Sequence, residues 1–164
     1  VKDSFASVDL TEHGFEVLFE AEWISRASTT ASTQPHSHRG WGLVREPVEL
    51  RAWEAVWRGV DGPTGIFDPS LLNNDAVTFL AEQREGRVVA GAVLNRSSTV
   101  VGLSNFFSEP TADAIRSWSG CVSFATALSG GLPLVGYESG DRLTAARSEG
   151  FKSIGALRVW VLTG

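Results

Sequence analysis

A tyrosine and a glutamate at the end of an apolar stretch are the first residues with a clear chemical use. Tyr137 and Glu138 close the run Leu132-Pro-Leu-Val-Gly-Tyr-Glu138, which has the composition and length of a buried strand. A phenol and a carboxylate at a strand end can act as general acid and general base, so both are catalytic candidates. The alternative is that they are ordinary strand-end residues without a chemical role.

A second apolar stretch, Val100 to Ser108, precedes a long helical pattern, so that strand, helix and strand follow one another. Two strands joined by a helix form a crossover unit and lie parallel in one sheet. Ligands bind beyond the carboxyl ends of such strands. We therefore expect a ligand site that combines Ser104 to Thr111 with Tyr137 to Asp141.

The N-terminal third contains one strong strand signal followed by a loop. Apolar residues alternate with mostly acidic ones, which predicts a strand whose buried face is formed by Phe15, Val17, Phe19, Ala21 and Trp23. The stretch from Ser25 to Gly40 is rich in Ser and Thr and has no periodicity. We expect it to be an exposed, mobile loop.

A helix and a hairpin are predicted next. The apolar stripe between Pro47 and Gly59 contains Trp53 and Trp57 at helical spacing, so this helix should pack on the sheet through its tryptophans. The runs at 77–83 and 88–94 face each other across a turn glycine and predict an antiparallel hairpin. The apolar stretch that ends at Ser108 continues this meander as a third strand.

Two more helices and a last strand complete the pattern. The helix that starts near Pro110 has an apolar face made of Ile115, Trp118, Val122 and Ala125. Ser139 can cap a shorter helix, and the run from Ile154 to Leu162 predicts a final strand. The expected fold class is α/β (α+β), a mixed and mostly antiparallel sheet with a central parallel strand pair, flanked by helices, in a single domain over residues 1–164.

Composition narrows the function classes. The 164 residues carry a net charge of −5, and the basic residues are scattered, so we expect no nucleic-acid partner. No apolar run approaches the roughly 20 residues of a membrane span, so we expect a soluble protein with no membrane partner. The single cysteine, Cys121, cannot form an internal disulfide and should be a buried apolar residue. A cytoplasmic location is the default expectation.

A histidine pair raises the question of a metal site. His36 and His38 lie two apart in an extended segment, so their imidazoles would point to the same side. A complete site needs a third or fourth ligand, and only His13 and scattered carboxylates are available. A solvated loop is the favoured interpretation, and we expect no metal.

From Phe15 to Leu162 the predicted order is strand, helix, three antiparallel strands, helix, strand, helix and closing strand. Two stretches are distinctive: Gly86-Arg-Val-Val-Ala-Gly-Ala-Val93, and above all Ala145-Ala-Arg-Ser-Glu-Gly-Phe151 followed by Gly155-Ala-Leu-Arg-Val-Trp160. Together they resemble the GNAT acetyltransferase superfamily. The resemblance implies that acetyl-CoA binds where two strands part and that its acetyl group passes to an amine. It also implies a cofactor-binding role for Ser104, Asn105, Phe106, Phe107 and Thr111, and an acid or base role for Tyr137 and Glu138.

The loop that holds the cofactor pyrophosphate in this superfamily is not matched here. The corresponding stretch, Ser108-Glu-Pro-Thr-Ala-Asp-Ala-Ile-Arg-Ser-Trp118, contains no glycine. Glu109 and Asp113 place negative charge where the phosphates would lie, and Arg116 falls inside the helix. The tyrosine that many members use as the acid for the departing thiolate corresponds to Ala146. The chain thus resembles a degenerate member.

Three functional hypotheses follow. The first is a GNAT-like protein with a rebuilt cofactor loop that binds a small molecule or a partner, with weak or no acetyl transfer. The second is an active N-acyltransferase that uses acetyl-CoA on an unidentified amine. The third is a structural subunit that associates with itself as a homodimer. The loop without glycine favours the first hypothesis and leaves the cofactor open.

Overall fold

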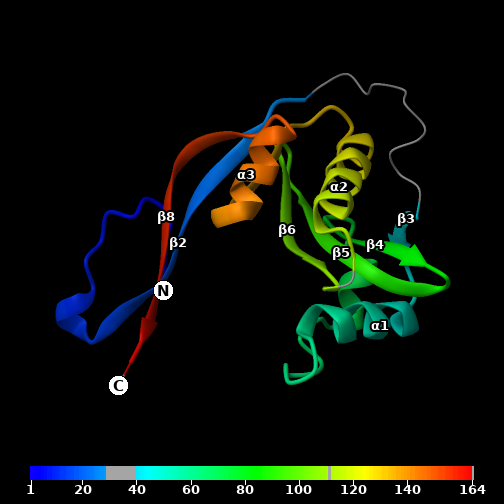
Figure 1. Ribbon diagram of the computed structural model, residues 1–164, viewed down its shortest axis with the longest axis horizontal. Helices are drawn as coiled ribbons and strands as arrows, with labels where there is room; N and C mark the ends of the chain where they lie inside the picture. Colours follow the sequence, from blue (N-terminus) through cyan, green and yellow to red (C-terminus); the bar gives the residue numbers. More distant parts are fainter. Residues whose placement is uncertain (29–39, 111, 164) are drawn as a thin grey trace. The chain divides into compact units, whose positions relative to one another are not determined.

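The computed structural model describes residues 1–28, 40–110 and 112–163. The chain divides into two compact units, one formed by Val1–Arg26 with Val135–Gly164 and the other by Ala27–Leu134. Figure 1 shows the elements of both units along the chain. His36, His38 and Thr111 lie outside the described residues. The single-domain organisation stays a prediction.

The first unit is built on four strands in the order β1-β8-β2-β7, with helix α3. Strand β8 runs antiparallel to both β1 and β2. The elements are β1 (Lys2–Asp3), the 3-10 turn η1 (Thr11–His13), β2 (Phe15–Arg26), β7 (Leu134–Glu138), α3 (Gly140–Ser148) and β8 (Lys152–Leu162).

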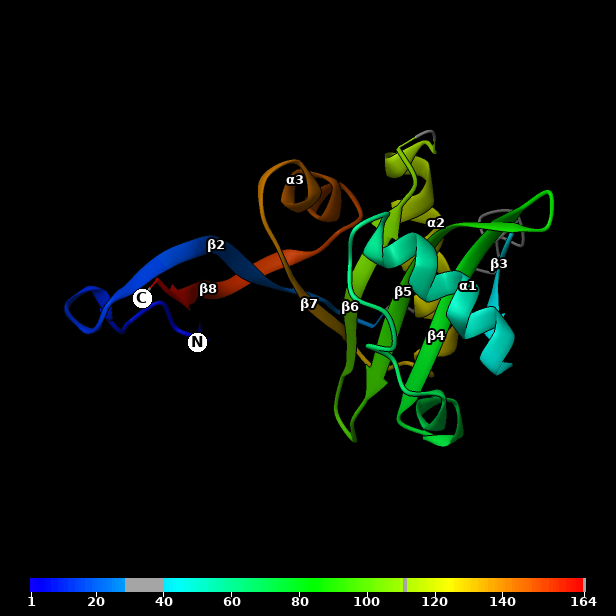
Figure 2. The same ribbon diagram turned by 90° about the horizontal axis from the view of Figure 1, so that it is seen from below.

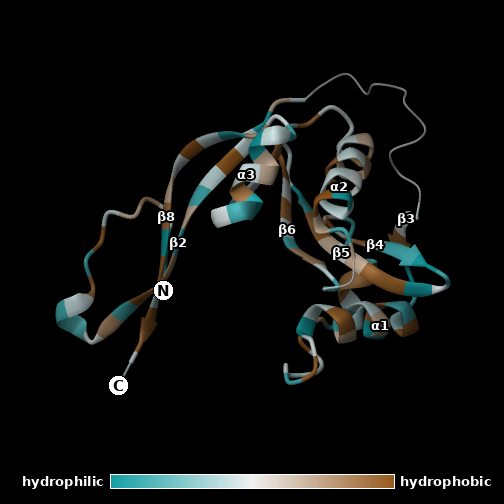
Figure 3. Ribbon diagram, in the orientation of Figure 1, coloured by the Kyte–Doolittle hydropathy of each residue, from teal (hydrophilic) through white to brown (hydrophobic). Residues whose placement is uncertain are grey.

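Strand β2 differs from its predicted burial. Val17 and Phe19 are 45% and 38% exposed, whereas Ala21 and Ile24 are buried. The pairing of β2 with β8 is irregular after Val17 and again after Trp23, so one alternation does not hold along the whole strand. The prediction of one continuous buried face is therefore wrong, and the strand also extends past the expected loop start to Arg26. Figure 3 shows apolar stretches along both β2 and β8.

The second unit is an antiparallel sheet in the order β6-β5-β4-β3, with α1 and α2 on its two faces (Figure 2). Adjacent residues of β6 show this arrangement, because Phe106 packs on Trp118 of α2 and Phe107 on Trp53 of α1. The elements are β3 (Trp41–Val44), α1 (Pro47–Arg58), the 3-10 turn η2 (Pro69–Asn73), β4 (Val77–Arg84), β5 (Arg87–Arg96), β6 (Val101–Ser108) and α2 (Ala114–Leu128).

Helix α1 confirms the prediction from its tryptophans. Its start is fixed by a capping box, in which the side chains of Glu46 and Glu49 each bond the other's backbone, and by Pro47 at the first helical position. Trp53 has no exposed surface, and its Nε1 donates to the carbonyl of Leu80 at 2.8 Å. This bond lets an indole enter the core without an unpaired N–H.

The predicted hairpin is also confirmed. Its turn residues Glu85 and Gly86 have φ values of 51° and 76°, which suits the two-residue turn that joins twisted antiparallel strands. Gly86 adopts this backbone without strain.

Helix α2 begins at Ala114, four residues after Pro110, with Asp113 as its cap. The prediction that Ile115 is part of its apolar face is wrong, because Ile115 is 73% exposed. The other three predicted residues, Trp118, Val122 and Ala125, are buried as expected. Ser117 and Cys121 extend this buried face, and the Ser117 hydroxyl donates to the buried carboxylate of Glu82 on β4. Ile115 lies in the first turn of the helix, outside the buried set.

Over the described residues the fold class is the predicted one, a mixed α+β fold whose strands are mostly antiparallel with one parallel pair, together with three α-helices. Within the described part of the chain, every helix is too short or too polar to cross a membrane. Cys121 is fully buried, as its apolar surroundings predict.

Candidate functional site

Glu138 lines two hollows of the first unit. It ends strand β7 and stands just before α3, whose cap Ser139 has extended backbone that turns the chain into the helix. Two hollows, with volumes of about 520 Å³ and about 370 Å³, are both lined by Glu138 and Ser139. The larger also contacts Glu20, Glu22, Leu143 and Arg158, and the smaller Phe19, Tyr137, Asp141 and Arg142.

Burial dominates the electrostatics of Glu138. It raises the pKa of the Glu138 carboxyl above its ordinary value, and the positive charge of Arg142 only partly opposes this effect. A carboxylate with a raised pKa holds a proton more readily near neutral pH, which is the property required of a general base.

The two glutamates of β2 that line the larger hollow are each paired with an arginine. Glu20 bonds Arg158 at 2.7 Å, and Glu22 bonds Arg147 at 2.8 Å. A hydrogen bond from Ser153, with help from Arg147, lowers the pKa of Glu22. Both carboxylates are thus paired with arginines, and Glu138 is the candidate for proton transfer at the larger hollow.

Tyr137 shares the smaller hollow with Glu138. Its ring also packs edge-on against Trp23 of β2, with centroids 5.5 Å apart. The two residues predicted as acid and base are thus brought to one hollow of the first unit. Their catalytic roles stay a prediction.

The second unit carries the four described residues predicted to bind the cofactor. Asn105 has a φ of 52° at a bulge, where two residues of β6 stand opposite one of β5 between the pairs Gly91–Phe107 and Val93–Ser104. The Asn105 amide donates to the hydroxyl of Ser104 at 3.3 Å. The bulge interrupts the regular ladder with β5 at this point, and the cofactor role of this segment stays a prediction.

The side chains of Phe106 and Phe107 have structural roles. Each is 8% exposed, and their rings lie 4.9 Å from Trp118 and Trp53, respectively. A cofactor role for these two residues can therefore involve only their backbone.

Backbone N–H groups of the loop between β6 and α2 donate hydrogen bonds to acceptors within the chain. Asp113 Oδ1 accepts the N–H of Arg116 at 3.0 Å, which caps the helix. The N–H of Ala112 donates to Glu109 O, and the N–H of Glu109 donates to Val89 O. Backbone donors of Glu109, Ala112 and Arg116, around this helix start, are thus bonded within the chain and are not free for a phosphate.

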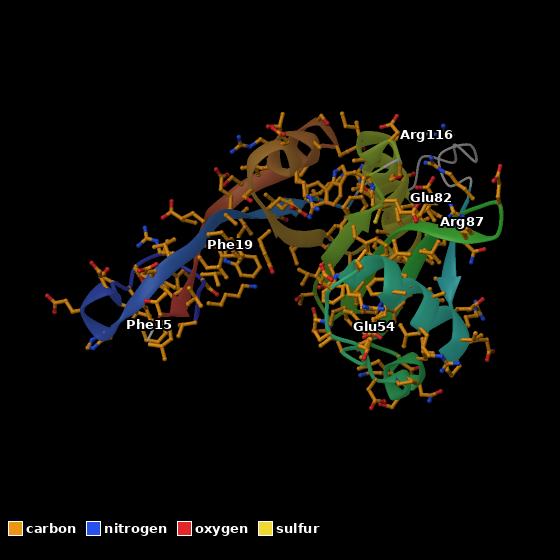
Figure 4. The ribbon with its side chains drawn as sticks, turned by 60° about the horizontal axis from the view of Figure 1, so that its bottom comes forward. Phe15, Phe19, Glu54, Glu82, Arg87 and Arg116 are labelled. Carbon is orange, nitrogen blue, oxygen red and sulfur yellow. The ribbon has the colours of Figure 1, made fainter. Side chains whose placement is uncertain are left out.

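A buried charged cluster in the second unit was missed from the sequence. Glu82 on β4, labelled in Figure 4, is 5% exposed and accepts hydrogen bonds from Arg84 and from Ser117. Burial, and secondarily the charge of Glu82, raises the pKa of the Cys121 thiol, which makes Cys121 unreactive. The signal available in the sequence was the position of Glu82 within the mostly apolar run 77–83.

The predicted site residues therefore form two groups. Tyr137 and Glu138 belong to the first unit, and Ser104–Phe107 belong to the second. Their combination in one ligand site stays a prediction. Among residues 1–28, 40–110 and 112–163, no three His, Cys, Asp or Glu side chains gather as a metal site.

Solved structures with the same fold are numerous. A conserved protein of unknown function from Staphylococcus epidermidis superposes with a TM-score of 0.72 at 11% identity, over 94% of this chain and 66% of its own. A GCN5-related N-acetyltransferase from Kribbella flavida gives 0.63 at 15% identity, over 94% of this chain and 62% of its own. The chain has the GNAT fold.

A third GNAT-fold structure, a GCN5-related N-acetyltransferase-like protein from Streptococcus suis, gives a TM-score of 0.58 at 15% identity, over 93% of this chain and 67% of its own. The chain thus spans about two thirds of these relatives' length, slightly less for the first two. No protein-family model matches the sequence, and the search of curated proteins gives no match. At these identities the likeness establishes the fold and leaves the activity open.

Proposed function

We propose that this chain is a GNAT-fold protein that binds a small molecule and has weak or no acetyl transfer. The observation that carries the proposal is the cap of α2, where Asp113 accepts the N–H of Arg116 at 3.0 Å. A pyrophosphate at this position would have to displace the Asp113 carboxylate and would meet its negative charge. Glu109 adds a second carboxylate to the same loop.

The hollows around Glu138 support a ligand site in the first unit. Their volumes of about 520 Å³ and about 370 Å³ fall in the size range of small-molecule sites. Their lining combines apolar groups such as Leu143 and Phe19 with the partly buried Glu138. A ligand with a hydrogen-bond donor or a positive charge fits this lining best.

One observation favours an active acetyl-CoA-dependent N-acyltransferase as the second candidate. Burial raises the pKa of Glu138, which suits a general base that removes a proton from an amine, with Tyr137 as the acid. In that case the cofactor would be held through backbone groups of the bulge at Ser104–Phe107.

A homodimer is the third candidate. Strands β2 and β8 expose several large apolar side chains on one ribbon, and Phe19 among them is labelled in Figure 4. The exposed set is Val17, Leu18, Phe19, Ile154, Val161 and Leu162.

Acetyl-CoA titration with thermal unfolding tests the proposal. A ligand at 100 times its dissociation constant adds about 2.7 kcal/mol of stability. We expect no shift in melting temperature for the wild-type protein at millimolar acetyl-CoA. The double variant Glu109→Gly plus Asp113→Gly should gain a saturable shift, because glycine is tolerated at a helix cap and removes both carboxylates.

The matched control is Asp61→Gly plus Glu85→Gly, which removes the same charge from exposed positions of the same unit. The control should stay unresponsive to acetyl-CoA. A saturable shift in the wild-type protein would replace our proposal by the acyltransferase alternative. Equal responses of the double variant and the control would contradict the cap mechanism.

A further inference from the structure

Three side chains of the first unit form a cation site. Lys2 Nζ lies 4.0 Å from the ring centroid of Tyr137 and 4.6 Å from that of Trp23. The two rings are nearly perpendicular, at 79°. They come from β2 and β7, and Lys2 comes from β1, so three strands meet at one ammonium group.

Hydrogen bonds hold this arrangement in place. Trp23 Nε1 donates to the carbonyl of Ser4 at 3.0 Å, which fixes the indole beside the segment that carries Lys2. The carboxylate of Asp3 accepts the N–H groups of Phe5 and Val8, at 3.1 and 2.8 Å. The aromatic pair and its cation are therefore preorganised within this unit.

The ammonium of Lys2 is held by ring faces. In the described part of the chain Lys2 makes no ion pair. Cation–π attraction at an exposed site is weak, and a primary ammonium is strongly hydrated, so Lys2 is a replaceable occupant. A methylated ammonium loses less hydration on entering the same space and should bind the rings better.

We propose that Trp23 and Tyr137 form a binding site for methylated ammonium ligands, and that Lys2 is an internal competitor for this site. The charges nearby favour a cation, because the hollow that Tyr137 lines contains the carboxylates of Glu138 and Asp141 against the guanidinium of Arg142. The site lies wholly in the first unit and shares Tyr137 with the smaller hollow around Glu138, so it rests on the function proposed above and narrows its ligand class. The cap mechanism at α2 lies in the other unit and is tested separately, with acetyl-CoA.

The probes are choline and its uncharged isostere, 3,3-dimethylbutan-1-ol. Heteronuclear NMR of the full chain follows the indole N–H signal of Trp23 during each titration. Choline should shift this signal in a saturable way, whereas the isostere should not. Lys2→Ala should tighten choline binding by about two- to fivefold, the range expected when an exposed cation–π competitor is removed.

The other lysine of the chain supplies the matched control. Lys152→Ala removes the same charge from an exposed position of the same unit and should leave choline affinity unchanged. Tyr137→Phe keeps the ring and should retain binding, and Tyr137→Leu should lose it while thermal unfolding verifies that the variant folds. No choline shift in Lys2→Ala, an equal response to the isostere, or equal gains in Lys2→Ala and Lys152→Ala would each overturn the proposal.

Discussion

Replacing Gly91 by alanine tests the packing that holds the predicted cofactor strand in place. Gly91 lies on β5 opposite Phe107 of β6. A Cβ at this position would approach Phe107 Cε1 to 2.6 Å and would come still closer to Trp53 Nε1. Trp53 has no exposed surface, so it has no free space into which it can move.

Two penalties determine the size of the effect. Overpacking a rigid core costs about 1–3 kcal/mol. Displacement of the Trp53 indole would also break its 2.8 Å bond to Leu80 O and leave a buried N–H unpaired, for about 1–3 kcal/mol more. We expect Gly91→Ala to lose about 2–5 kcal/mol of unfolding free energy, or to fail to fold.

Urea unfolding followed by tryptophan fluorescence measures this loss. Gly102→Ala on β6 is the matched control, because its Cβ would meet Asn95 O at 3.5 Å and Asn95 Cβ at 3.9 Å, both ordinary contacts. Since alanine orders more cheaply than glycine in a strand, the control should be neutral or gain up to about 1 kcal/mol. If Gly91→Ala matched the control, the close approach of Trp53 and Phe107 would not be rigid, and our reasoning about this core would be refuted.

Two further predictions concern the buried carboxylate of Glu54 and the partly buried carboxylate of Glu138. The carboxylate of Glu54 accepts hydrogen bonds from the N–H groups of Gly65, Ile66 and Phe67. Glu54→Gln should therefore lose about 2–4 kcal/mol of unfolding free energy in urea, while the control Glu85→Gln, at an exposed position, should change little. Equal losses in the two variants would contradict the anchoring role of Glu54. Burial raises the pKa of Glu138, so its ionisation costs stability as pH rises above the ordinary value of 4.5. Glu138→Gln should therefore raise the melting temperature relative to wild type more at pH 7 than at pH 4, and a constant difference across this range would rule out the raised pKa.

The long elements of the fold could be predicted because each carries a clear period. The stripe that contains Trp53 and the hairpin around Gly86 were identified from sequence with nearly the observed bounds. Strands β1 and β3 were not predicted, since two and four residues are too few to show alternation. Pairing with β8 and β4 defines them, and that pairing depends on residues distant in the sequence.

Burial within an element was less predictable than its type. Alternation in β2 suggested one buried face, but the irregular pairing with β8 changes which side chains are covered. Ile115 fits the same apolar stripe as Trp118 and Val122, which are buried, yet it lies in the first turn of α2 and is exposed. The burial of Ser117 was missed, because its hydroxyl bonds Glu82 on β4 and no local pattern reports a contact between distant elements.

In the candidate site, too, the positions of residues could be predicted from the sequence, whereas their contacts with distant elements could not. The position of Tyr137 and Glu138 at a strand end was visible in the sequence, whereas the contact of Tyr137 with Lys2 depends on the packing of β1, β2 and β7. Asp113 was recognised by its charge, and its bond to the Arg116 N–H supplies a second reason why an anion is disfavoured at α2. The two features lie in different units and rest on different physics, one on burial and one on a helix cap. Substitution at one of them should therefore leave the other unchanged, so that ligand binding near Glu138 and cofactor binding at α2 can be measured separately.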